Sequence, residues 1–111
     1  MGGAEHLAEA DRFSAEAYEI APWEASVLGT RGSVLVELGR LEEGVKLLEE
    51  SALLAVDRPT RGAAACWLAR AAARRGDMAE ARRRLVQAER LWPDGEGMAA
   101  TRELVEGVGR G

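Results

Sequence analysis

Apolar residues recur along this chain at intervals of three and four positions, and glycine or proline interrupts the pattern at several points. That interval is the period of an amphipathic α-helix, whereas residues that favour strands are sparse. The pattern therefore predicts an all-α fold. Its breakers divide the chain into six predicted helices, over Ala4–Ile20, Trp23–Leu38, Leu41–Val56, Thr60–Arg75, Met78–Leu91 and Gly95–Glu106.

Two of the predicted joints are a glycine followed by one polar residue, at Gly39-Arg40 and Gly76-Asp77. Glycine readily adopts the left-handed conformation that ends many helices, because it has no Cβ atom. A joint this short brings the next helix back antiparallel to the first. Each joint therefore predicts a helical hairpin, the unit from which helical solenoids are built.

Small residues in the predicted helices recur at a nearly constant spacing. Two sets are each separated by 34 and then by 37 residues, which indicates an internal repeat. The first set is Ala10, Gly44 and Ala81, and the second is Ala17, Ser51 and Ala88. The prolines Pro22, Pro59 and Pro93 are separated by 37 and then by 34. The longer interval therefore has its additional residues between Ser51 and Pro59.

A helix-turn-helix unit of 34 residues resembles the tetratricopeptide repeat, although no tryptophan or tyrosine stands at the motif's aromatic places. Gly44 and Ser51 replace the alanines of the last unit, which predicts weaker contacts at these two positions. The last full unit carries the motif in Leu68-Ala69, Ala72, Gly76-Asp77, Ala81-x3-Leu85, Ala88 and Pro93. The preceding unit carries it in Arg31-Gly32, Leu35, Gly39, Gly44-x3-Leu48 and Ser51.

The resemblance implies a right-handed α-α superhelix in a single domain over residues 1–111. Its parts are the second helix of a half repeat (4–22), two repeats (23–58 and 59–93) and a C-terminal capping helix (95–106). About three repeats are typically needed for a stable solenoid. This chain is therefore expected to be part of a longer protein or to pair with another copy. An unrelated bundle of five or six helices is the alternative fold.

In the resembled family, the first helix of each pair lines a concave groove that accepts a peptide or helix of a partner protein. One version of that groove grips a C-terminal carboxylate with Lys, Arg and Asn side chains. Gly29 and Ser33 stand where that version needs Lys and Asn, so this clamp is not expected here. The groove of this chain is expected to be lined by Ser26, Gly29, Ser33, Val36, Ala63, Cys66, Trp67, Arg70, Ala73 and Arg74.

A stripe of Trp67, Arg70 and Arg74 lies at helical spacing on one side of an alanine-rich helix. Arginine can donate two parallel hydrogen bonds to a carboxylate, and tryptophan is enriched among residues that dominate interface energy. The stripe thus favours a partner that carries acidic side chains. The alternative is that Trp67 belongs to the core while both arginines extend to solvent.

The first predicted helix lacks a partner within its own unit and carries Leu7, Phe13 and Tyr18, which form a predicted self-association edge. The function expected from the resemblance is a non-catalytic adaptor that binds another protein or peptide. A structural domain that pairs with copies of itself, as a homodimer, is one alternative. A targeting module excised from a larger protein is the other.

The chain has 15 basic and 19 acidic residues, which argues against a general affinity for nucleic acid. Its first residues include an acidic side chain and no continuous apolar stretch, so neither a signal peptide nor a membrane span is expected there. A single cysteine, Cys66, cannot form an internal disulfide and fits a reducing compartment. The expected location is the cytoplasm.

No enzyme activity, cofactor or metal is expected. The sequence contains no nucleophile motif, glycine-rich phosphate loop or HExxH motif, and its carboxylates alternate with arginines on predicted exposed faces. His6 and Cys66 are too few and too far apart for a metal site, which needs three or four ligands. The basic run Arg82–Arg84 is expected to be a solvated face, because consecutive residues fan around a helix.

Overall fold

The computed structural model describes residues 2–107, and over this range the chain forms helices and no strand. The predicted all-α class is therefore confirmed, and each predicted helix is present. Residues 1 and 108–111, which the predicted domain includes, lie outside the described residues. The helices are α1 (Gly2–Ile20), α2 (Ala25–Glu37), α3 (Leu41–Leu54), α4 (Arg58–Arg74), α5 (Met78–Leu91) and α6 (Met98–Gly107).

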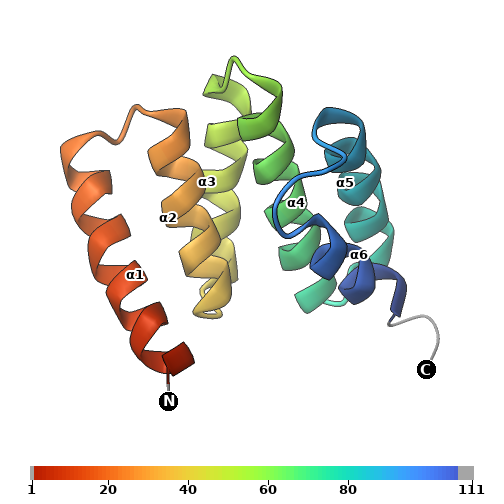
Figure 1. The fold of residues 1–111 in the computed structure, drawn as a ribbon, viewed down its shortest axis with the longest axis horizontal. Helices are drawn as coiled ribbons and strands as arrows, with labels where there is room; N and C mark the ends of the chain where they lie inside the picture. The colour runs from red at the N-terminus through yellow and green to blue at the C-terminus, as the bar shows by residue number, and fades with distance from the viewer. Residues whose placement is uncertain (1, 108–111) are drawn as a thin grey trace.

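Helices α1 to α5 form a row in chain order, with α1 at one end and α5 at the other (Figure 1). Within this row α2 also contacts α4 directly and α3 packs against both, while α6 packs against α4 and α5. Gly39 and Gly76 have φ angles of 85° and 82°, in the left-handed region. After each glycine the next amide donates back across the turn, from Arg40 to the Leu35 carbonyl and from Asp77 to the Ala72 carbonyl, both at 2.9 Å. These bonds close α2–α3 and α4–α5 as the predicted hairpins.

Aspartates fix where two of the helices begin. The Asp57 carboxylate accepts a hydrogen bond from the Thr60 amide (2.8 Å), and Asp77 accepts one from the Glu80 amide (3.2 Å). Each satisfies an amide that the first turn of a helix leaves without a partner. The bond from Thr60 lowers the pKa of Asp57, because the charged carboxylate is the better acceptor.

Helices α2 and α3 approach most closely at Gly32 and Gly44. A Cβ atom on Gly44 would lie 2.8 Å from the Gly32 carbonyl oxygen, so only glycine fits without a shift. Ser51 is fully buried, and its hydroxyl donates to the Ala25 carbonyl at 2.7 Å. The expectation of weaker contacts at Gly44 and Ser51 is therefore wrong: one permits the closest backbone approach, and the other adds a hydrogen bond between the two helices.

Helices α4, α5 and α6 share one hydrophobic cluster. Alanines let α4 and α5 pack closely, since small side chains allow the backbones to approach, and α6 closes the cluster with two apolar side chains. The members below 4% exposure are Ala65, Cys66, Ala69, Ala72, Ala81, Leu85, Ala88, Met98 and Val105. Helix α6 thus covers the open end of the last hairpin.

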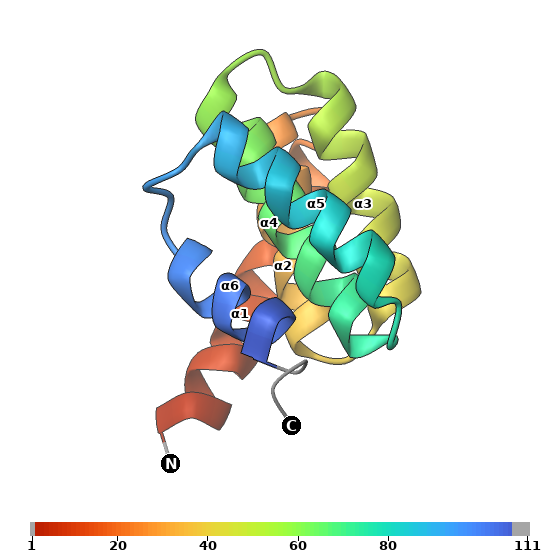
Figure 2. The same ribbon diagram turned by 90° about the vertical axis from the view of Figure 1, so that its right-hand side faces the viewer.

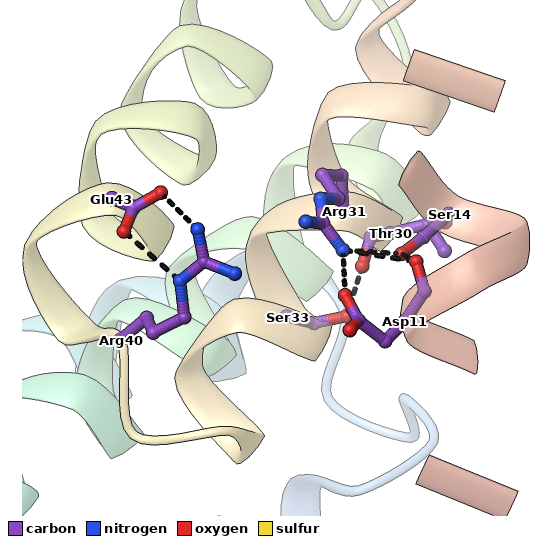
Figure 3. A network of polar contacts seen from close by, with 7 residues as sticks. All are labelled: Asp11, Ser14, Thr30, Arg31, Ser33, Arg40 and Glu43. Atoms are coloured by element: carbon purple, nitrogen blue, oxygen red, sulfur yellow. Dashed lines mark hydrogen bonds and ion pairs between the residues drawn. The ribbon is translucent and has the colours of Figure 1, made fainter. Parts of the chain in front are cut away.

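Among the described helices, α1 has close backbone contacts with α2 alone. The contact is polar near its middle: Arg31 donates to the Asp11 carboxylate (2.6 Å) and to the Ser14 hydroxyl (3.1 Å), as Figure 3 shows. Tyr18 packs against a buried cluster of leucines from α2 and α3, so it is part of this chain's own core. Of the predicted self-association edge, Leu7 is partly buried and Phe13 is 56% exposed.

Candidate functional site

A hollow of about 290 Å³ lies between α2 and α4. Its walls combine hydroxyl groups with two tryptophan rings, a composition typical of sites that hold an apolar group between hydrogen-bonding neighbours. Five of the predicted groove residues line it, namely Ser26, Gly29, Ser33, Ala63 and Trp67. The remaining lining residues are Thr30, Pro59, Thr60, Ala64 and Trp92.

Trp92 is the aromatic residue among the lining residues that sequence reasoning missed. It follows α5 and packs on two glycines: a Cβ atom on Gly62 would lie 2.6 Å from its Cβ, and one on Gly95 would lie 2.4 Å from its ring. Those glycines let the chain after α5 pass directly over the start of α4. Gly62 was the available signal, because a glycine inside a helical pattern often has a packing reason. Trp23, which follows Pro22, is 68% exposed.

The other half of the predicted groove is not open. Val36 and Cys66 are buried at 0% and 2% exposure, and Ala73 packs against the cluster that α6 closes. The Cys66 sulfur lies 3.0 Å from the Thr101 hydroxyl of α6. The groove therefore ends near Trp67, because α6 covers the next part of α4.

Arg70 joins α4 to the segment that carries α6. Its Nε donates to the Thr101 hydroxyl (2.6 Å), and one terminal nitrogen donates to the Gly97 carbonyl (3.0 Å). Its guanidinium also stacks over the Trp67 ring, 4.3 Å from the ring centroid. Arg70 is thus a structural anchor that also orients one wall of the hollow, and it does not simply extend to solvent.

Arg74 is held in a similar way at the end of α2. It donates to the Val36 carbonyl (2.6 Å), which lies in the last helical turn, and to the Glu37 carboxylate (3.1 Å). Glu37 also lies 3.8 Å from Arg70. Both arginines of the predicted stripe therefore have a carboxylate partner within the chain, where a partner's acidic side chain was expected.

The basic run on α5 pairs with acidic neighbours. Arg83 and Arg84 both donate to Glu80, at 2.8 and 2.9 Å, while Arg82 is exposed. The bonds from Arg83, and then those from Arg84, lower the pKa of Glu80 although partial burial opposes them. An exposed pair of the same kind links Arg40 to Glu43 and lowers the pKa of that carboxyl (Figure 3).

The one histidine and the one cysteine of the chain lie on different helices. His6 is exposed on α1, and the Cys66 thiol is buried under α6. Within residues 2–107, no three His, Cys, Asp or Glu side chains gather where they could hold a metal ion. In the same range, no helix is long and apolar enough to cross a membrane.

Comparison with protein-family models, with curated proteins and with solved structures found no match.

Proposed function

We propose that this chain is a non-catalytic, tetratricopeptide-like adaptor that binds a peptide segment of another protein in the hollow between α2 and α4. The observation that carries the proposal is that Trp67 and Trp92 line the same hollow as four residues with hydroxyl side chains. Tryptophan side chains recur as anchors of protein interfaces. The ligand's apolar side chain lies between the two rings, and its backbone bonds to the hydroxyls. The expected setting is the cytoplasm.

Three features support this function over an enzyme or a clamp for a carboxylate. The hollow has no cationic side chain among its lining residues, and both nearby arginines already have partners. Helical hairpins packed in a row are also the arrangement that the resembled family uses to form a groove. The proposed superhelix therefore holds an apolar side chain as its main specificity element.

A peptide-display selection with a blocked variant tests the function. Ala63→Arg places a long side chain in the hollow, whereas Ala79→Arg makes the same change at an exposed position of α5 outside it. Peptides selected on the native chain should bind Ala79→Arg equally and lose about tenfold or more in affinity for Ala63→Arg. Circular dichroism confirms that both variants fold. Selected peptides that bind both variants alike would refute the assignment of the hollow.

A further inference from the structure

A second and larger hollow, of about 950 Å³, lies on the other side of α4, between α3 and α5. Figure 2 shows these two helices running along the same side of the molecule. Ala65 and Leu68 of α4 form the floor, and Leu53 of α3 and Val86 of α5 stand on the walls. Leu53 is 85% exposed and Val86 is 47% exposed. Apolar side chains gathered around an open groove are typical of an interaction site.

The rim of this α3–α5 groove is basic, although the chain as a whole has a net charge of −4. Glu49 is the one acidic residue among the lining residues. Arg83 and Arg84 pair with Glu80, and Arg84 also lies 3.6 Å from Glu49. Among the described residues, Arg61 and Arg90 form no ion pair. The groove therefore combines an apolar floor with two cations that are free to pair with an acidic partner.

Helix α1 carries the complementary pattern. Phe13 and Ile20 are 56% and 75% exposed and lie seven residues apart, so they share one face two turns apart. Glu9 lies four residues before Phe13, and Glu16 lies four residues before Ile20, so the glutamates share the face of the two apolar residues. Both glutamates are exposed. Arg61 of α4 and Arg90 of α5, the two lining cations that form no ion pair among the described residues, line the groove from neighbouring helices.

Helix α1 and the α3–α5 groove also carry opposite charges. Five residues of α1 are acidic, namely Glu5, Glu9, Asp11, Glu16 and Glu19, whereas Arg12 is its one arginine. Like-charged surfaces repel, so a basic helix would be excluded from the groove, while an acidic amphipathic helix is attracted. The same contact would also remove the apolar side chains of α1 and of the groove from water, which favours association.

We propose that α1 of one copy docks into the α3–α5 groove of a second copy. Phe13 and Ile20 cover the apolar floor, while Glu9 and Glu16 pair with Arg61 and Arg90. Helix α1 lies at the opposite end of the row from α5, so a chain does not fill its own groove (Figure 1). The contact is heterologous: each copy keeps one free α1 and one free groove, and association extends with concentration.

Analytical ultracentrifugation at low salt tests this contact. The native chain should show a mass that rises with concentration and falls when salt is added. Arg61→Glu/Arg90→Glu should raise the dissociation constant about tenfold or more. The control, Arg75→Glu/Arg82→Glu, changes the net charge equally at exposed positions outside the groove and should associate nearly as the native chain does. A native chain that stays monomeric overturns the proposal and leaves the groove for an acidic helix of another protein.

Charge exchange identifies the two partner surfaces. Glu9→Arg/Glu16→Arg should be monomeric alone, because its α1 is then basic and the groove is basic too. Mixed with Arg61→Glu/Arg90→Glu, it should associate again, since each variant now offers the surface that the other needs. Failure of the mixture to associate, with both variants folded by circular dichroism, would overturn the assigned pairing. The peptide-blocking variant Ala63→Arg should leave self-association unchanged, because α4 separates the two hollows.

Discussion

The two ends of the row of helices are finished differently. At the C-terminal end, α6 buries Met98 and Val105 in the cluster formed by α4 and α5. Thr101, fully buried in the same helix, accepts a hydrogen bond from Arg70. At the N-terminal end, α1 has one neighbouring helix, and Phe13 and Ile20 face solvent. One end is thus closed by the chain itself, while the other keeps an apolar stripe open.

This difference shows that ten residues can complete an end when they supply both apolar and polar contacts. Helix α6 is shorter than α1, yet three of its side chains are buried. Helix α1 has nineteen residues, and Ser14 is its one buried residue in the described range. Length alone therefore does not decide whether a terminal helix closes one end of the molecule. The partners it finds decide this.

Loss of the buried Met98 side chain should have the largest effect on stability. Met98→Ala removes a side chain that is 2% exposed and leaves a cavity between α6 and α4. The free energy of unfolding should fall by about 2–5 kcal/mol. Urea denaturation measures it, with Met98→Leu as the volume-conserving control, expected to cost less than about 1.5 kcal/mol. Equal stability of both variants would mean that α6 does not close the core.

Gly44→Ala should come next. The added Cβ would lie 2.8 Å from the Gly32 carbonyl oxygen and from Val36 Cγ2, so α2 and α3 must separate. Crowding of this kind costs about 1–3 kcal/mol, although alanine favours the helix itself. Gly3→Ala in α1 is the matched control, since nothing lies within 4 Å of its new Cβ. Thermal melts that rank Gly44→Ala at or above the native chain would contradict the close contact.

Arg31→Ala should weaken the packing of α1 on α2 and leave the other helices unchanged. The Arg31 side chain is 12% exposed and supplies the hydrogen bonds to Asp11 and Ser14, so its loss leaves the buried Ser14 hydroxyl with fewer partners. The expected cost is about 1–2 kcal/mol. Hydrogen exchange should accelerate in α1 and stay unchanged in α4 and α5. Arg12→Ala, at an exposed position of α1, should leave these exchange rates as they are.

Acidification should lower the stability of α4 and α5, because two carboxyl groups of these helices have lowered pKa values. Asp57 and Glu80 have folded-state pKa values below their ordinary ones, because hydrogen bonds favour the charged form. Their contribution is complete above the unfolded-state pKa, near 4, and is lost as the pH falls through the lower folded-state values. Stability should hold down to about pH 5 and then decrease. Glu80→Gln should show a shallower decrease in acid melts.

Phe13→Ala should have the smallest effect on the fold. The ring is 56% exposed, so the free energy of unfolding of the dilute chain should change by no more than about 0.5 kcal/mol. In concentrated solution the same variant should associate less than the native chain, since Phe13 belongs to the proposed contact. A large loss of stability in dilute solution would show that α1 buries Phe13 against its own chain.

Sequence reasoning located the helices and hairpins because their signals are local. Gly39 and Gly76 end helices through their own backbone conformation, and the apolar period specifies each helix face. Half of the predicted groove also lines the observed hollow, because the resemblance assigns the groove to the first helix of each hairpin, and Ser26, Ser33 and Ala63 lie on those helices.

The rest depends on contacts between distant residues. Arg70 meets Thr101, thirty-one positions later in the chain, and no local pattern indicates that α6 lies over Cys66. Cys66 was therefore predicted to line an open groove although it is buried. Val36 is buried as well, in a cluster with Leu48 of α3 and Leu68 of α4. The same reason explains why Gly44 was expected to weaken packing. Gly44 allows the backbone of Gly32 in the neighbouring helix to come close, and only the tertiary structure brings these two residues together.

The position of Cys66 under α6 gives this protein a built-in reporter. It is the one cysteine of the chain, and its 2% exposure hides the sulfur from reagents in solution. An alkylating reagent reaches the thiol when α6 lifts from α4, so the labelling rate measures how often that end of the molecule opens. A single mass-spectrometric time course, without any engineered probe, can therefore follow the motion of α6 in the native protein.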